Sequence, residues 1–281
     1  MSAVVAARPS LGTRISYAFN DGLLVAWRNL LGISRVPTVL VFELVQPIMF
    51  VLLFRFVYEN AFVGVLPGVD YVQFLMPGIF VQNAIFGSTA TAIGLAEDLK
   101  KGLIDRFRSL PMARSAVLIG RTTADLVKNF LLVVVMVVIG YIVGFRFEEG
   151  LLAALGVVVL VVAVGFTFSW ISATIGLAIK QVEAVQAAIF TLIFPIVFVS
   201  AAFVPVMGMS EVLQPVAEHN PVTYWCNLAR YLSLGEVAVT DPATGEVAYS
   251  LQELVFRSTL WIAILLGIFV PLSIRLYRKL T

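Results

Sequence analysis

The sequence has few charged residues, one cysteine and one histidine, and each shortage excludes a class of protein. Only 13% of the 281 residues are Asp, Glu, Lys or Arg, while 60% are hydrophobic. A soluble domain carries about 25% charged residues. The single cysteine, Cys226, excludes an internal disulfide and any paired-cysteine metal site. Together these shortages indicate an integral membrane protein.

The sequence also lacks the short motifs of nucleotide hydrolysis and metal catalysis. It contains no GxxxxGK[ST] phosphate-binding loop and no HExxH motif. The chain therefore cannot act as an ATPase by itself, and we expect no catalytic residue and no metal on it. The lone His219 is close to Pro221, which favours a structural or capping role over a ligand or base role.

Six apolar runs have roughly the length of about 20 residues that a helix needs to cross a bilayer. They are residues 36–58, 74–95, 126–145, 151–179, 185–206 and 256–274. The stretch 11–31 is too polar to span and fits an interfacial amphipathic helix with Trp27 at headgroup depth. The expected fold class is an all-α polytopic membrane protein with a single transmembrane domain, 1–281.

Residues 207–253 interrupt this pattern between the fifth and sixth runs. Apolar and aromatic residues there are broken by prolines, which favours a re-entrant or interfacial hairpin. We expect this segment to cap the exit of the pathway, with Tyr224 and Trp225 at the outer headgroup level. The residues that we single out in it are His219, Asn220, Pro221, Tyr224, Trp225 and Arg230.

The distribution of basic residues predicts the orientation of the chain. If the N-terminus is cytoplasmic and six spans follow, 15 of the 19 Lys and Arg residues fall on the inner side. This bias is the one that cytoplasmic loops carry in membrane proteins. The sequence therefore predicts that both termini are cytoplasmic.

The long charged stretch between the spans, residues 97–115, has an apolar stripe. Leu103, Phe107 and Leu110 recur at helical spacings, and Pro111 ends the helix. Asp105, Arg106 and Arg108 would lie at the rim of such a stripe, where charges set specificity. The pattern fits either a solvated positive-inside loop or an element that docks on a soluble partner.

Four polar residues inside the first two spans form a candidate substrate pathway: Glu43, Gln46, Gln82 and Asn83. Glu43 is the clearest ionisable residue within a span, and such residues suggest a functional site. Two structural alternatives stay open for it. The carboxylate could snorkel towards the cytoplasmic interface, or it could hydrogen-bond within the helix bundle.

The charged stretch carries a family resemblance. The segment GLIDRFRSLPMARSAVL at 102–118, followed by Gly120-Arg121 and Ala124-Asp125, resembles the signature of ABC-2 type exporter permeases. The match is to the daunorubicin/doxorubicin-resistance permease group of actinobacteria, and it covers essentially the whole chain. Other residues that agree are Gln46-Pro47, Leu53-Phe54, Met76-Pro77-Gly78, Asn220-Pro221, Thr223-Tyr224 and Arg230.

The resemblance implies a cytoplasmic coupling helix within 97–115, an N-terminal interfacial helix and an outer re-entrant hairpin before the sixth span. Such permeases pair with an identical or homologous permease and dock on two ABC ATPase subunits, which hold ATP and Mg²⁺. No cofactor is expected on this chain, and membrane lipid but no nucleic acid is an expected partner. The expected function is export of a drug, lipid or glycolipid across the bacterial plasma membrane.

Two alternatives from other classes stay open. One is a proton-coupled carrier centred on Glu43, although such carriers usually show more than one ionisable group and internal inverted repeats. The other is a polytopic membrane enzyme or scaffold acting on lipid, which would need convergent polar groups. Copurification of a soluble ATPase would favour the ABC exporter over both.

Overall fold

The computed structural model describes residues 26–27, 31, 37–57, 70–102, 116–240 and 247–280. Within these ranges the chain is helical, with one isolated bridge between Thr240 and Val247 and no strand. The prediction of an all-α polytopic membrane protein is confirmed. Of the predicted interfacial helix, 11–31, only Ala26, Trp27 and Leu31 are described. The coupling residues from Leu103 to Pro111 lie outside the described ranges.

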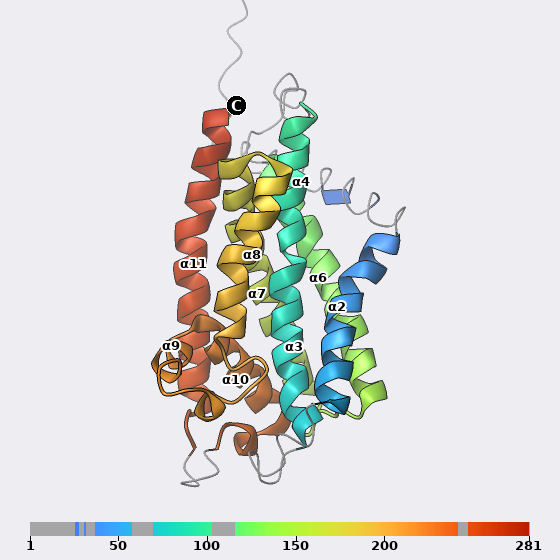
Figure 1. Cartoon of the computed structure of the whole chain (residues 1–281), viewed down its shortest axis with the longest axis vertical. Coiled ribbons are helices and arrows are strands. Elements are labelled where there is room, and N and C mark those ends of the chain that lie inside the picture. The colour runs from blue at the N-terminus through green and yellow to red at the C-terminus, as the bar shows by residue number, and fades with distance from the viewer. Residues whose placement is uncertain are drawn as a thin grey trace, which may run out of the picture.

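Long helices run alongside one another, and shorter elements gather at one end of the bundle (Figure 1). The long helices are α2 (Pro37–Phe56), α3 (Tyr71–Gly87), α4 (Thr89–Lys100), α6 (Ala116–Val143), α7 (Gly150–Ile179), α8 (Val182–Phe198) and α11 (Leu251–Leu280). Between α8 and α11 lie η2 (Val206–Gly208), α9 (Gln214–Glu218), α10 (Pro221–Leu234) and η3 (Glu236–Val239). α4 and α11 end at the opposite end from α10 (Figure 1).

Four segments of the described chain are long and apolar enough to cross a membrane. They are Tyr71–Lys100, which joins α3 and α4, Leu118–Val143 of α6, Gly150–Ile179 of α7 and Leu251–Leu280 of α11. α8 is a shorter apolar helix, and α2 has 20 residues and packs against α3 and α6. α2 and α8 occupy the positions of the predicted first and fifth spans.

The predicted second span, 74–95, is longer in the structure. α3 begins at Tyr71, where the Asp70 side chain accepts a hydrogen bond from the Val72 N–H group. A turn at Ser88 separates α3 from α4, and α4 continues to Lys100. The first residues of the predicted coupling stretch are therefore helical.

The helix that contains most of the predicted third span, 126–145, begins before it. α6 starts at Ala116, so Arg121, Asp125 and Lys128 are all part of the helix. Lys128 is one of the 15 basic residues expected on the inner side, but its side chain is buried and only 3% exposed. The helix accommodates these charges because partners on neighbouring helices pair with them, as described below.

The ends of the last two predicted spans differ as well. The fifth run, 185–206, begins at Val182 and ends at Phe198, shortly after Pro195. The sixth run, 256–274, is part of a helix that extends from Leu251 to Leu280 and includes the closing basic residues. Helix formers such as Leu, Arg and Lys continue a helix beyond the apolar part that the sequence identifies.

α7 is the central helix of the bundle, and it contacts α3, α4, α6, α8, α10 and α11. Its contact with α4 is a direct backbone approach, because a Cβ at Gly176 would lie 2.5 Å from the Ala92 carbonyl oxygen. Small residues at such a crossing are typical of helix packing in membranes. α7 thus fixes the positions of α3 and α4, which carry part of the candidate site.

Candidate functional site

The four polar residues that the sequence placed in a substrate pathway line one cavity. It has a volume of about 160 Å³ and lies between α2, α3 and α8. Its lining residues are Phe42, Glu43, Gln46, Pro47, Gln82, Asn83, Phe86, Gly87, Thr89, Ile189 and Phe190. The walls are therefore apolar and aromatic, with the polar groups contributed by α2 and α3. A drug-sized ligand needs roughly 300 Å³ or more, so the cavity in this conformation is too small for one.

Glu43 forms an ion pair with a residue that the sequence analysis did not single out. The Lys128 Nζ atom on α6 donates hydrogen bonds to Glu43 Oε1 at 3.0 Å and to the Gly87 carbonyl oxygen at 2.9 Å. The Lys128 side chain is 3% exposed and the Glu43 side chain is 20% exposed. Of the roles left open for Glu43, the structure shows hydrogen bonding within the helix bundle.

Two further polar contacts join α4 to α6 on the same side as Lys128. Thr91 Oγ1 donates a hydrogen bond to the Asp125 carboxylate. Arg121 Nη1 contacts Asp98 Oδ2 at 2.7 Å. Because positions 121, 125 and 128 lie on one face of a helix, the three contacts form a row. We call this row the polar seam, and its residues are Asp98, Arg121, Thr91, Asp125, Lys128 and Glu43.

The polar seam extends from the Lys100 end of α4 to the cavity. A glycine opposite Arg121 makes room for its side chain, since a Cβ at Gly94 would lie 1.4 Å from Arg121 Nη2. The signal for the polar seam in the sequence is the spacing of Arg121, Asp125 and Lys128, which are four and three residues apart. That pattern marks one helix face, but the predicted span began only at 126.

Some buried polar atoms near the cavity have no partner among the described residues. They include Glu43 Oε2 and Gln82 Oε1, both of which belong to cavity-lining side chains. An unpaired buried oxygen requires an explanation such as an ordered water or a ligand. The cavity therefore offers hydrogen-bond acceptors beside aromatic walls. No cluster of three or more His, Cys, Asp or Glu within the described ranges could hold a metal.

At the other end of the bundle, Arg230 holds α10 against α3. The fully buried guanidinium donates hydrogen bonds to the Phe74 carbonyl oxygen at 2.9 Å and to the Ala202 carbonyl oxygen at 3.1 Å. A third bond joins it to Asn227 Oδ1 at 3.1 Å, and its Cζ atom lies 3.6 Å from the centre of the Phe74 ring. Arg230 is thus a structural clamp for the segment between α8 and α11.

Asn220 and Pro221 together begin α10. Asn220 Oδ1 accepts a hydrogen bond from the Val222 N–H group at 2.9 Å, which makes it the N-cap, and Pro221 occupies the first turn. Asn220 Nδ2 also donates to the Ile196 carbonyl oxygen at 2.7 Å, at the end of α8. His219 is exposed, and its Nδ1 atom lies 2.9 Å from the Pro215 carbonyl oxygen.

The aromatic pair of α10, for which the sequence predicts a depth at the outer headgroup level, is buried within the protein. Trp225 is fully buried, and its Nε1 atom donates a hydrogen bond to the Ser258 carbonyl oxygen at 3.2 Å. Tyr224 is 4% exposed, and its hydroxyl accepts a hydrogen bond from Arg257 at 2.8 Å. Both rings therefore fasten α10 to α11 inside the protein, where their polar atoms find partners.

Comparison with known proteins places these features in a family. The model of the ABC-2 type transporter family matches residues 22–234. The chain is 29% identical over 272 residues to the daunorubicin resistance ABC transporter permease protein DrrB1 of Streptomyces coeruleorubidus, covering 97% of this chain and 89% of the relative.

Two further relatives are more distant in sequence. A probable doxorubicin resistance ABC transporter permease protein of Mycobacterium tuberculosis is 28% identical over 251 residues, covering 85% of this chain and 88% of its own. A putative transport permease of Cyanophora paradoxa is 28% identical over 224 residues, covering 77% and 76% of the two chains. The chain therefore belongs to the ABC-2 type transporter family and is a multi-pass permease subunit of an ABC exporter.

Proposed function

We propose that this permease moves a hydrophobic or amphipathic molecule, either a drug or a lipid or glycolipid, out across the bacterial plasma membrane. The observation that carries the proposal is the cavity in which Glu43, Gln46, Gln82 and Asn83 meet aromatic walls. Such a lining suits an amphipathic molecule, because a few polar groups orient a ligand whose body contacts apolar side chains. Membership of the exporter family sets the direction of movement.

The proposed pathway opens by movement of α2. Its packing partners are α3 and α6, whereas side chains that do not line the cavity, such as Val41 and Met49, are more than half exposed. The cavity needs to enlarge from about 160 Å³ before a drug-sized molecule fits. α2 is the helix whose displacement would enlarge it without disturbing the central helix α7.

The proposed topology has six spans, formed by α2, α3 with α4, α6, α7, α8 and α11. Both termini lie in the cytoplasm, and η2, α9, α10 and η3 form an outer re-entrant segment that caps the exit. This arrangement is supported by the basic residues at the ends of α4 and α11 and by the position of α10 at the opposite end (Figure 1). The count of basic residues in the sequence supports the same orientation.

The proposed energy source is a separate ABC ATPase, present in two copies with ATP and Mg²⁺, beside a second permease that is identical or homologous. The coupling residues from Leu103 to Pro111 would dock on it. They connect α4 to α6, and the polar seam joins these same two helices. A force on the connecting segment would therefore move α4 and α6 together and reach Glu43 through Lys128.

One observation in the structure favours the alternative of a proton-coupled carrier. Besides Glu43, the span formed by α6 contains the buried carboxylate of Asp125 and the buried amine of Lys128. Proton relays in membranes use such groups. The two functions differ in their energy source, and a transport assay separates them.

The experiment is purification of the tagged permease from its native membrane, with identification of every copurifying protein, followed by transport in sealed vesicles. The proposal expects a soluble ABC ATPase in the complex. It also expects export that persists when an ionophore dissipates the proton gradient and stops when ATP is replaced by a non-hydrolysable analogue. Export that follows the proton gradient without ATP would establish the carrier instead.

A further inference from the structure

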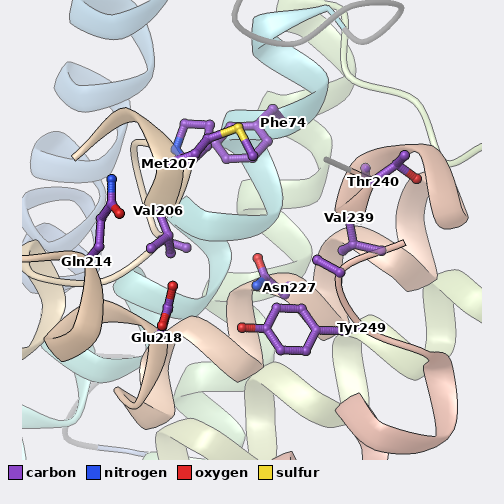
Figure 2. Close-up of a pocket in the computed structure, with 13 residues that line it drawn as sticks. Phe74, Val206, Met207, Gln214, Glu218, Asn227, Val239, Thr240 and Tyr249 are labelled. Carbon is purple, nitrogen blue, oxygen red and sulfur yellow. The ribbon is translucent and has the colours of Figure 1, made fainter. Parts of the chain in front are cut away.

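The segment between α8 and α11 lines a second cavity, which opens to solvent and is separate from the one that contains Glu43. It has a volume of about 350 Å³ and lies among η2, α9, α10, η3 and the first turn of α3 (Figure 2). Its lining residues are Phe74, Ala201, Pro205, Val206, Met207, Gln214, Glu218, Asn227, Ala238, Val239, Thr240, Ala248 and Tyr249. The two cavities share no lining residue, and this one is large enough for a small organic molecule.

Glu218 gives this outer cavity its charge. Among the lining residues that the structure describes, Glu218 is the only charged one, and its exposed carboxylate has no ion-pair or hydrogen-bond partner there. Figure 2 shows the carboxylate and the Tyr249 hydroxyl directed towards the same space from different elements. The carboxylate supplies the negative charge that attracts an organic cation, and the Tyr249 hydroxyl oxygen is a second acceptor beside it.

Arg230 is a cationic group beside the outer cavity, but it does not line the cavity. Its guanidinium is fully buried, and its N–H groups donate to the carbonyl oxygens of Phe74, Ala201 and Ala202 and to Asn227 Oδ1. An occupant would therefore meet a carboxylate, neutral polar groups and apolar walls, but no cationic side chain of the described chain.

We propose that the outer cavity is a binding site for an amphipathic organic cation. The apolar body of the ligand lies against Val206, Met207 and Val239, and its positive group lies beside Glu218 and Tyr249. Binding at this site requires neither the ATPase nor nucleotide. It can therefore be measured on the permease alone, and failure of the transport proposal would leave the result unaffected.

The experiment follows the reactivity of a cysteine placed in the cavity wall. Thr240→Cys introduces a thiol at a lining position, and the native Cys226 is fully buried, so the new thiol is the one that a maleimide reaches. The labelling rate is measured on purified protein in detergent. The probes are tetraphenylphosphonium and tetraphenylborate, which have nearly the same shape and opposite charge.

The proposal expects tetraphenylphosphonium to slow the labelling of Thr240→Cys and tetraphenylborate to have no such effect. Adding Glu218→Gln should raise the concentration needed for half protection by about two- to fivefold, the effect of losing one exposed ion pair. Glu211→Gln is the matched control, because Glu211 is an exposed carboxylate of the same segment that does not line the cavity. Its half-protection concentration should not change.

Val206→Trp tests whether the probe occupies this cavity, since the larger side chain fills it and should abolish protection. Labelling rates without probe report whether each variant keeps its fold. Equal protection by both probes, or protection that Glu218→Gln leaves unchanged, would overturn the assignment to a cation. Absence of protection by tetraphenylphosphonium would overturn the binding site itself.

Discussion

Glu43 and Lys128 are an ion pair between α2 and α6 at a depth where water has little access. Lys128 also donates to the Gly87 carbonyl oxygen, so the single ammonium group connects α2, α3 and α6. A buried pair contributes little compared with apolar residues of the same size, but loss of one partner leaves an uncompensated charge. The position of α2 therefore depends on both Glu43 and Lys128 remaining charged.

We expect Glu43→Gln and Lys128→Met each to lower the free energy of unfolding in detergent by about 3 kcal/mol. The double variant should recover part of this loss, because it leaves no unpaired charge. Glu97→Gln is the control, since its pair with Lys101 is exposed and contributes little. Losses that simply add in the double variant would show that the two side chains are not coupled.

At the residue scale, the sequence predicted which polar residues lie together, but it did not predict the cation that pairs with Glu43. Glu43, Gln46, Gln82 and Asn83 could be grouped because two adjacent spans must pack together. Lys128 could not be added, because a charged residue beside an apolar run is ordinarily the end of a span. Partners on α2 and α3 compensate its burial, and both lie far away in the chain.

α3 positions the outer segment through a direct backbone contact as well as through Arg230. A Cβ at Gly78 would lie 1.9 Å from the Ala202 carbonyl oxygen, so the helix and the turn after α8 touch without a side chain between them. Arg230 binds the same carbonyl group of Ala202 from α10. These contacts make α3, the turn and α10 one packed unit.

Gly78→Ala should therefore separate α3 from the turn, because backbone atoms cannot move aside as a side chain does. We expect a loss of about 1–3 kcal/mol in the free energy of unfolding, typical of overpacking in a filled core. Gly267→Ala is the matched control, since a Cβ at Gly267 on α11 meets no atom within 4 Å. Thermal unfolding of both variants in the same detergent makes the comparison. A Gly78→Ala protein as stable as Gly267→Ala would contradict this packing.

The ends of the helices were harder to predict than the existence of helices. Apolar runs identified α7 almost residue for residue, because α7 contains no charged residue. They failed at α4 and α6, whose helices continue through Asp98, Arg121 and Asp125. These charges pair across the two helices, so the apolar pattern ends before the helix does. The buried α10 was not predicted as a separate helix, since Pro221 and the polar residues before it are typical of a loop.

The molecule as a whole has two chemically different ends. α4 and α11 end in basic residues at one end, and α9 and α10 lie at the other (Figure 1). The proposed orientation places the basic end in the cytoplasm. Because the only native cysteine, Cys226, is fully buried, we expect little maleimide labelling of the native chain.

Cysteines at Val212 and Lys101 test this orientation in intact cells. Val212 is 83% exposed beside α9, and Lys101 follows the exposed end of α4. An impermeant maleimide should label Val212→Cys from outside, and Lys101→Cys only after the membrane is permeabilised. The reverse pattern would mean that the chain is inserted with the opposite orientation.

The central claim is that ATP hydrolysis on a separate subunit drives this permease through the coupling residues. Leu103, Phe107 and Leu110 provide the spacing of a helix docked in a groove, and Phe107 is the largest of them. These residues lie outside the described ranges, so the claim depends on the sequence pattern and on the position of the polar seam between α4 and α6. Burying one such ring contributes about 1.5–3 kcal/mol.

The most direct test is the affinity of the purified permease for its ATPase, measured together with substrate-stimulated hydrolysis, for the native chain and for Phe107→Ala. The account predicts an affinity lower by roughly one to two decades and loss of stimulation, while the variant still inserts in the membrane. Arg108→Ala should have a smaller, salt-dependent effect, because charges at a rim act through long-range attraction. If Phe107→Ala leaves affinity, stimulation and export unchanged, residues 103–111 are only a cytoplasmic loop and the account is wrong.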